Sequence, residues 1–371
     1  MMKRSLSPGW IAVGVLAFLL FLGLACARAP AAPAPPPVPP AAAPAPPPAP
    51  APAPAPKPAA PEFKLKAVAT NRALPQFKLL EWLGEELTKR TNGRVTLEVM
   101  GLPELGLTGF EMVRVLRAGL VDIADVLPGY VSGDLPLLEG ADIAGLFREY
   151  ETYEPAFNAW LKVLKANEEK MGGVFIGAHA WAKQILFSRK PIRDLSDLKG
   201  MKVRIWFTSL ADYMKALGAE PVTIPFAEVY TALERGTIDG VVTGTDAGFN
   251  IKLYEVSKYL VDIGVGPKMT AVVVSKKTWD KLPPDIRKVF EELGPELTKR
   301  GFELGRQITD TGIKGNVEKG MEWTPMKPEW SPVLKEVVEK QVVPAWAKRA
   351  GPDGKKAFNE VLAPLVGYTI Q

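Results

Sequence analysis

Apolar and polar residues alternate along residues 62–293 in a way that predicts short strands separated by helices. A period of two marks residues 94–100 as a strand, whereas apolar residues at helical spacing mark residues 75–93 as a helix that ends at an Asn-Gly pair. Residues 225–236 begin with proline and end with glycine, as a well-delimited helix does. Because strands and helices follow one another in turn, the pattern predicts an α/β fold with parallel strands covered by helices.

The same pattern places the other elements along the chain. Further strands are predicted at residues 63–70, 121–127, 173–181, 183–188, 202–206, 220–224, 238–244 and 269–279. Further helices are predicted at residues 108–120, 209–219 and 282–293, with a capped helical turn at residues 194–200. The tail after residue 293 carries many prolines and is predicted to consist mostly of helices and turns.

The first 27 residues have the features of an export segment. Two basic residues precede a long apolar run, which ends in small residues around Cys26. The apolar run is only slightly shorter than a bilayer crossing of ~20 residues, so a membrane span is the alternative. The ending GLAC is similar to a lipoprotein cleavage box with Cys26 as the lipidated residue, although Gly23 replaces its usual larger aliphatic residue. Cleavage after Ala27 is the competing route.

Residues 28–61 consist almost entirely of proline and alanine. Proline fixes φ and removes amide donors, so we expect an extended polyproline II linker with a reach on the order of 100 Å. We favour a tether between an anchor and a folded domain over a featureless disordered arm, because an anchor candidate directly precedes it. The remaining residues, about 310, are enough for two lobes.

Composition excludes several classes of function. Cys26 is the only cysteine of the chain, so the folded part has no disulfide, and the export segment alone indicates the compartment. The net charge of +5 is spread without a basic cluster, so nucleic acid is not a predicted partner. A serine triad would have to use His179, the only histidine, and no metal or cofactor motif is present. We therefore predict neither an enzyme nor a cofactor or metal site.

Arg204 is the candidate for ligand binding that the pattern itself offers. It lies near the end of a predicted strand, where ligands bind in α/β sheets, and Trp206 and Phe207 follow it. A guanidinium can hold both oxygens of a carboxylate, and aromatic walls suit small-molecule pockets. The alternatives are a solvent-facing arginine and two aromatic residues that simply pack in a core.

Several segments resemble one family of proteins. These segments are DLKGMKVRIW, YMKALGAEPVTIPFAEVYTALERGTIDG, LYEVSKYL and VVVSKKTWDKLPPDIRKVFEEL, with TNGRVTLEVMGLPELGLTGFEMVRVLRAGLVDIAD nearer the N-terminus. They resemble the solute-binding subunit of tripartite ATP-independent periplasmic (TRAP) transporters, the dicarboxylate-binding-protein (DctP) family. The resemblance runs from about residue 63 to residue 293.

The resemblance implies a two-lobed periplasmic binding protein fold with a ligand cleft between the lobes. Lobe I would comprise residues 62–181 and 267–315, and lobe II residues 182–266 and 316–371, joined by crossing strands and a long helix. It implies a periplasmic protein that captures a small organic acid by cleft closure and delivers it to the small and large membrane subunits of the transporter.

The resemblance also implies the residues of the site. Arg204 would pair with the ligand carboxylate, Phe226 would form an aromatic wall, and Tyr130 would lie on a loop facing the cleft. Lys183 stands where relatives usually carry a second arginine, and Thr243 where an asparagine often touches the ligand. Trp206 replaces a frequent proline.

These departures exchange strong polar donors for hydroxyl and aromatic groups. Because an unpaired buried charge is costly, we expect a ligand with one carboxylate and an apolar or aromatic body. A succinate-like dicarboxylate, the family default, is the alternative. Two other classes of function remain as rivals: an exported enzyme acting on small organic acids, and a surface lipoprotein serving as a scaffold or sensor partner.

Overall fold

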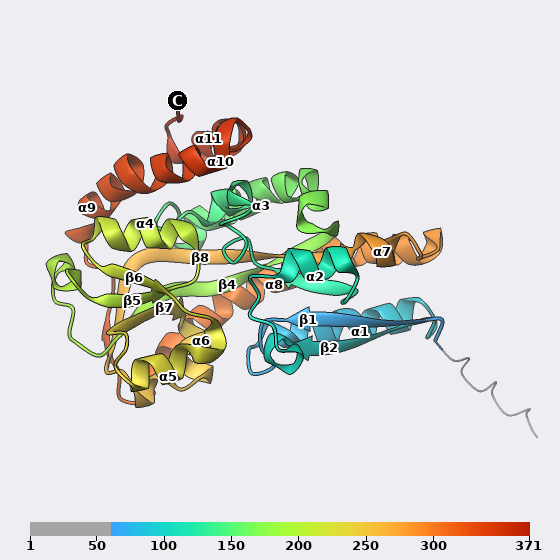
Figure 1. The fold of residues 1–371 in the computed structure, drawn as a ribbon, viewed down its shortest axis with the longest axis horizontal. Helices are drawn as coiled ribbons and strands as arrows, with labels where there is room; N and C mark the ends of the chain where they lie inside the picture. Colours follow the sequence, from blue (N-terminus) through green and yellow to red (C-terminus); the bar gives the residue numbers. More distant parts are fainter. Residues whose placement is uncertain (1–60) are drawn as a thin grey trace, which may run out of the picture. The chain divides into compact units, whose positions relative to one another are not determined.

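Figure 1 shows the computed structural model, which describes residues 61–371. The predicted export segment, the linker up to residue 60 and Cys26 lie outside the described residues. Two long antiparallel strands, β4 (Gly173–Ser188) and β8 (Tyr259–Ser275), run side by side through the fold.

Nine strands occur within residues 61–371. Besides β4 and β8 they are β1 (Phe63–Ala69), β2 (Val95–Gly101), β3 (Ile123–Val126), β5 (Lys202–Ile205), β6 (Glu220–Thr223), β7 (Gly240–Gly244) and β9 (Glu322–Thr324). They form one mixed sheet in the order β2-β1-β3-β8-β4-β7-β5-β6, and β9 pairs with β8. Parallel pairing within β1–β3 and within β5–β7 confirms the α/β prediction, while β4 and β8 are antiparallel to their main neighbours.

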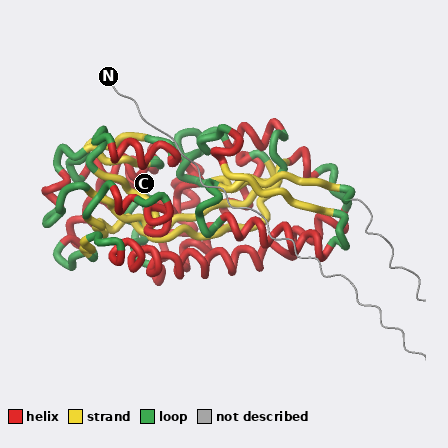
Figure 2. Tube along the Cα trace, turned by 90° about the horizontal axis from the view of Figure 1, so that it is seen from below, coloured by secondary structure: helices red, strands yellow, loops and turns green. Residues whose placement is uncertain are grey.

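Helices cover both faces of this sheet (Figure 2). The longer ones are α1 (Phe77–Arg90), α2 (Met112–Ala118), α3 (Tyr150–Ala166), α4 (Thr208–Ala216), α8 (Pro284–Glu318), α9 (Trp330–Val337) and α10 (Val343–Ala357). The shorter ones are α5 (Val229–Glu234), α6 (Thr245–Asn250), α7 (Lys276–Trp279) and α11 (Ala363–Val366). In Figure 1, α3, α4 and α9–α11 lie on one side of β4 and β8, whereas α1 and α5 lie on the other.

The middle of β4 and β8 is irregular. The register between the two strands shifts between Trp181 and Gln184. On β8, Gly264 and Gly266 have φ values of +71° and +85°, which side chains rarely adopt. A Cβ on Gly266 would also lie 1.9 Å from the carbonyl oxygen of Phe147. This irregular zone separates the part of each strand beside β1–β3 from the part beside β5–β7 and β9.

Three apolar clusters stabilise the described residues. The largest fills the space under α2, α3, α4, α9 and α10 and continues along β1, β3, β4, β5, β7 and β8. A second lies between α1, the first strands and the N-terminal half of α8, and a third surrounds β7 and α5. Each end of the sheet therefore has apolar packing on both faces, as parallel strands require.

Most predicted elements are present, with three differences. The strands predicted at 173–181 and 183–188 are one strand, β4. The strand predicted at 269–279 begins ten residues earlier, at Tyr259, and its last four residues form α7. The helix predicted at 282–293 continues to Glu318.

The long helix α8 packs closely against β4. An ideal Cβ on Gly294 would lie 1.9 Å from the carbonyl oxygen of Ile176, so only glycine permits this approach. The helix then continues past Pro295 for more than six further turns. Within residues 61–371, no helix combines the length and apolar character of a bilayer crossing.

Candidate functional site

Arg204 lies in the middle of three parallel strands. On β5 it pairs with Val222 of β6 on one side and with Val241 of β7 on the other. Its Nε donates to the carbonyl oxygen of Ile224 at 3.0 Å, and its Nη1 donates to that of Val242 at 3.3 Å. These two bonds fix the guanidinium plane, whereas Nη2 has no partner within the described residues.

The Arg204 side chain is a buried cation. The residue is 1% exposed, and no carboxylate of residues 61–371 forms an ion pair with it. Burial lowers the pKa of Arg204, and the neighbouring Tyr130 hydroxyl acts in the opposite direction. Since arginine stays protonated at neutral pH, the site carries an uncompensated positive charge. An anion brought into contact with Nη2 would offset that cost.

A small cavity surrounds this guanidinium. It is lined by Thr70, Leu74, Leu127, Tyr130, Trp181, Gln184, Arg204, Trp206, Phe226, Thr243, Gly244 and Ala247. Most of these residues lie at or just after the C-terminal ends of β1, β3, β5, β6 and β7, where α/β sheets bind ligands. The volume of about 30 Å³ is about that of one water molecule in the liquid. A molecule much larger than water therefore fits only if the walls move.

Aromatic rings close the cavity on one side. The rings of Tyr130 and Trp206 meet edge to face at 5.3 Å, and Trp206 meets Phe207 in the same way at 4.6 Å. The indole Nε1 of Trp206 donates to Gln184 Oε1 at 3.3 Å. These contacts pair the polar edge of the indole and leave flat apolar surface toward the cavity.

The structure brings five of the seven predicted residues to the cavity wall: Tyr130, Arg204, Trp206, Phe226 and Thr243. Phe207 is buried behind Trp206 and does not line the cavity.

Lys183 also lies away from the cavity. Its Nζ is 2.6 Å from Asp262 Oδ2 and 2.5 Å from Glu149 Oε1. Burial alone would lower the pKa of Lys183, but the two carboxylates raise it above the ordinary value. The ammonium is thus neutralised within the fold.

Sequence reasoning missed several residues of the wall. Thr70 and Gln184 line the cavity, and Thr70 Oγ1 is buried without a partner. Gln76 and Asp246, which lie near the cavity, are also buried with unpaired side-chain atoms. A polar residue directly after an apolar strand, such as Thr70 after β1, is the signal that would have pointed to this wall.

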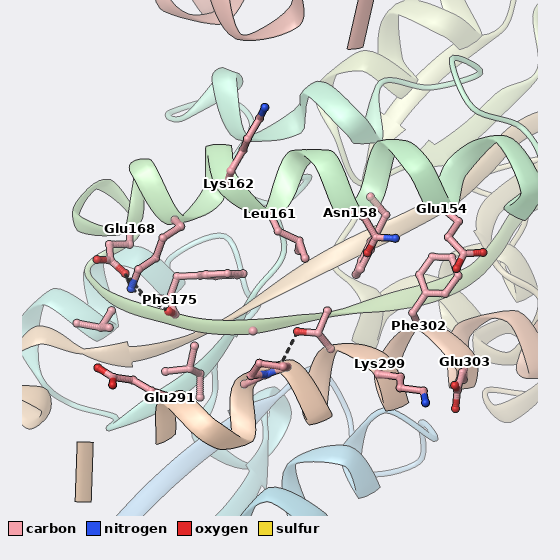
Figure 3. A pocket seen from close by; sticks show the side chains of 18 of the residues that line it. Glu154, Asn158, Leu161, Lys162, Glu168, Phe175, Glu291, Lys299, Phe302 and Glu303 are labelled. Carbon is pink, nitrogen blue, oxygen red and sulfur yellow. Dashed lines mark hydrogen bonds and ion pairs between the residues drawn. The ribbon is translucent and has the colours of Figure 1, made fainter. Parts of the chain in front are cut away.

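A cavity much larger than the one at Arg204 lies elsewhere (Figure 3). It is a groove of about 930 Å³ between α3, the N-terminal half of β4 and α8. Its charged side chains are exposed or self-paired: Lys162 projects outward from α3, and Lys165 Nζ contacts Glu168 Oε2 at 2.8 Å. Because none of its cations is both buried and unpaired, the groove lacks the feature that marks the cavity at Arg204.

Comparison with known families assigns the chain. The sequence profile of the bacterial extracellular solute-binding protein family 7, DctP, matches residues 67–348. The chain belongs to the DctP family. The family's description is of solute-binding proteins rather than enzymes.

Similar proteins and structures agree with this assignment. The C4-dicarboxylate-binding periplasmic protein DctP of Rhodobacter capsulatus is 31% identical over 209 residues, which cover 55% of this chain. The chain spans 62–63% of the length of the first curated relatives that it matches.

Solved structures of similar proteins show the same fold. DctP7 of Bordetella pertussis, an extracytoplasmic solute receptor binding pyroglutamic acid, has a TM-score of 0.76 and 24% identity, covering 81% of this chain and 99% of its own. A TRAP periplasmic solute-binding protein of Desulfovibrio salexigens, with bound orotic acid, has a TM-score of 0.76 and 22% identity, covering 82% and 99%. The predicted two-lobed α/β receptor fold is thereby confirmed.

Proposed function

We propose that this DctP protein is the extracytoplasmic receptor of a TRAP transporter and captures a small organic acid in the cavity at Arg204. The observation that carries the proposal is the buried guanidinium with a free Nη2 and no carboxylate partner within the described residues. A ligand carboxylate that meets Nη2 supplies the missing counter-charge. Because water is excluded there, the charge-assisted hydrogen bond is stronger than on a surface.

The wall indicates what kind of acid fits. The wall offers the aromatic faces of Trp206 and Phe226 and the hydroxyl of Thr243, and Arg204 is the only cation among the described residues that line it. The nearby cation Lys183 is paired with Asp262 and Glu149. We therefore favour an acid with one carboxylate and an apolar or ring-shaped body. The related structures with pyroglutamic acid and orotic acid, both ring-shaped acids with one carboxylate, support this class over a C4-dicarboxylate.

Binding would work by closure of two lobes. We assign residues 62–181 and 267–315 to lobe I, and residues 182–266 and 316–371 to lobe II. The boundary falls in the irregular middle of β4 and β8. The cavity wall takes Thr70 and Tyr130 from lobe I and Arg204 and Phe226 from lobe II. An acid that touches both lobes binds the closed form better and shifts the population toward it.

The family supports a proposal for the partners and the location. DctP proteins are periplasmic solute receptors, and we propose that the closed form docks on the small and large membrane subunits of a TRAP transporter. The export-like segment at residues 1–27 would direct secretion, and lipidation of Cys26 would hold the receptor at a membrane through the proline-rich linker.

Screening by thermal shift against organic acids, followed by calorimetry with the best ligand, tests this function. We expect Arg204→Ala to weaken the affinity by roughly tenfold or more, the scale of a lost charge-assisted hydrogen bond. The melting temperature of the ligand-free variant should stay nearly unchanged, because the lost side chain is an uncompensated buried charge. Arg204→Lys is the matched control, which keeps the charge but loses the planar fork.

A large loss of stability with intact binding would refute the proposed role of Arg204. Detection of turnover of a small acid would instead favour the exported enzyme.

A further inference from the structure

Four buried polar side chains at or near the cavity have atoms without a hydrogen-bond partner within the described residues. They are Thr70, Gln76, Arg204 and Asp246, and each is at most 6% exposed. Buried polar groups are almost always paired in native proteins, so each exception calls for a ligand, a water or a functional reason. In the proposed function, the ligand carboxylate is the missing partner of the Arg204 guanidinium. The carboxylate of Asp246 is the other charged group in this set, and the proposed function does not use it.

Asp246 lies directly behind the cavity wall. It is in the first turn of α6, two residues after Gly244, and neither of its carboxylate oxygens has a partner. An ideal Cβ on Gly244 would lie 2.8 Å from Asp246 Oδ1 and 3.3 Å from Gln184 Nε2. Gly244 and Gln184 both line the cavity. Because Gly244 has no side chain, nothing on that residue separates Asp246 Oδ1 from a molecule at the wall.

Gln76 approaches the same carboxylate from the other proposed lobe. It precedes α1, and both polar atoms of its amide lack partners of good geometry. Burial raises the pKa of Asp246 to about 6, while the backbone N–H of Ala247 and the Gln76 amide act to lower it. The carboxylate is therefore mostly ionised at neutral pH and accepts hydrogen bonds. Gln76 falls in the proposed lobe I and Asp246 in the proposed lobe II, so closure of these lobes would bring the pair together.

We propose that Asp246, with Gln76 beside it, forms a second polar contact of the cleft and accepts a hydrogen bond from an N–H or O–H group that the ligand carries on the body beyond its carboxylate. This inference rests on the proposed function and narrows its ligand class. The favoured ligands are amide or hydroxy acids, in which one molecule satisfies both Arg204 and Asp246. A plain hydrocarbon acid satisfies Arg204 but leaves a buried carboxylate unpaired. Sites of this kind discriminate strongly against an analogue that lacks the donor.

Two pairs of acids test the inference on the whole chain. Pyroglutamate and 5-oxotetrahydrofuran-2-carboxylate differ only by a ring N–H in place of a ring oxygen, and lactate and propionate differ only by a hydroxyl. We expect the wild-type protein to bind the donor-bearing member of at least one pair tenfold or more tightly by calorimetry. Asp246→Ala should abolish that preference while it changes the affinity for the donor-free member less than threefold.

Two further variants make the result specific. Gly244→Ala keeps Asp246 but places a methyl group against Oδ1, and φ at Gly244 is −61°, which alanine adopts freely, so we expect the same loss of preference. Asp310→Ala removes an exposed carboxylate on α8 and should leave the preference intact. Gly244→Ala also serves as the decisive variant if Asp246→Ala fails to fold.

The outcomes separate the two proposals. If acids bind in an Arg204-dependent manner, but the wild type does not prefer the donor-bearing member of either pair, the role of Asp246 is refuted and the receptor function stands. A preference that survives in both Asp246→Ala and Gly244→Ala refutes it equally. If no acid binds, or if Arg204→Ala has no effect on binding, the proposed function itself fails.

Discussion

The Arg204 guanidinium shows how a single residue defines this site. Two backbone carbonyl groups, from Ile224 and Val242, hold the side chain in place without neutralising its charge. A carboxylate partner within the protein would have made the same arginine a structural ion pair, as Lys183 is with Asp262 and Glu149. The difference between the binding role proposed for Arg204 and the structural role of Lys183 therefore lies in the neighbouring residues and not in the charge of the side chain.

Asp246 should make the stability of the ligand-free protein depend on pH. Its pKa in the folded state is raised by burial to about 6 from an ordinary value of 3.8, so the folded state binds the proton more tightly than the unfolded chain does. The free energy of unfolding therefore falls as the pH rises from about 4 to above 6, by at most about 3 kcal/mol from this group. Asp246→Asn removes this contribution.

Chemical denaturation of the wild type and Asp246→Asn at pH 5 and pH 7.5 measures the effect. We expect the variant to gain stability relative to the wild type at the higher pH. Glu139 and Asp142, whose pKa values burial also raises, titrate in both proteins and cancel in the comparison. Tyr150, the ionisable neighbour of Asp246, stays neutral throughout this range. An equal pH response of the two proteins would show that the carboxylate is solvated.

At the scale of elements, glycine decides how closely α8 lies against β4. The carbonyl oxygen of Ile176 occupies the place where a Cβ on Gly294 would be, whereas Gly315, further along the same helix, faces the ring of Phe249. A backbone atom cannot move aside as a side chain can. A side chain at Gly294 is therefore expected to disturb the packing of α8 more than a side chain at Gly315.

Replacement of these glycines by alanine should have unequal effects. At an exposed position in a helix, replacement of glycine by alanine raises the free energy of unfolding by roughly 1 kcal/mol. We expect Gly294→Ala to lower the free energy of unfolding by roughly 2 kcal/mol or more, because α8 must shift away from β4. Gly315→Ala should cost less, since the Phe249 ring can rotate. Urea unfolding of both variants checks this, and equal stabilities would contradict the close approach.

The elements that were predicted wrongly from the sequence all contain residues that usually end a strand or a helix but lie inside one here. Lys183 and Gln184 interrupt the apolar pattern of β4, so one strand was predicted as two, yet both are buried by partners distant in the chain. Gly264, Gly266 and Pro267 indicate a turn, but here they shape the irregular middle of β8. Gly294 and Pro295 signal a helix end but lie inside α8.

Local pattern therefore predicted the class of fold, most elements and Arg204 with the aromatic residues after it. The resemblance to a family supplied Phe226, Tyr130 and Thr243. Neither source could show that Lys183 is neutralised inside the fold, or that Gln76 and Asp246 come together. Such facts depend on contacts between residues far apart in the sequence.

At the scale of the whole molecule, the cavity of about 30 Å³ means that opening must precede binding. Ser132 Oγ lies 2.8 Å from Thr208 Oγ1. In the proposed division, Ser132 belongs to lobe I and Thr208 to lobe II, so the contact would bridge the cleft. A disulfide between them would hold the lobes together, because the two side chains already approach closely. The folded part contains no native cysteine that would interfere.

The double variant Ser132→Cys, Thr208→Cys, in a Cys26→Ser background, tests this requirement. Stopped-flow measurement of tryptophan fluorescence, to which Trp206 at the cavity wall contributes, should show at least tenfold slower association of the ligand in the oxidised protein. Reduction should restore the rate, and each single variant should behave as the wild type. Unchanged association in the oxidised protein would mean that the acid enters without separation of these loops.

The order of strands in the sheet also limits when this chain can fold during its synthesis. β8 separates β3 from β4, although it follows β4 by about seventy residues. No nascent chain that ends before Ser275 can complete the sheet around β1–β3, because its central strand has not yet been made. For the secretion proposed above, this delay would favour passage through a translocation channel, since the unfinished chain has no completed sheet.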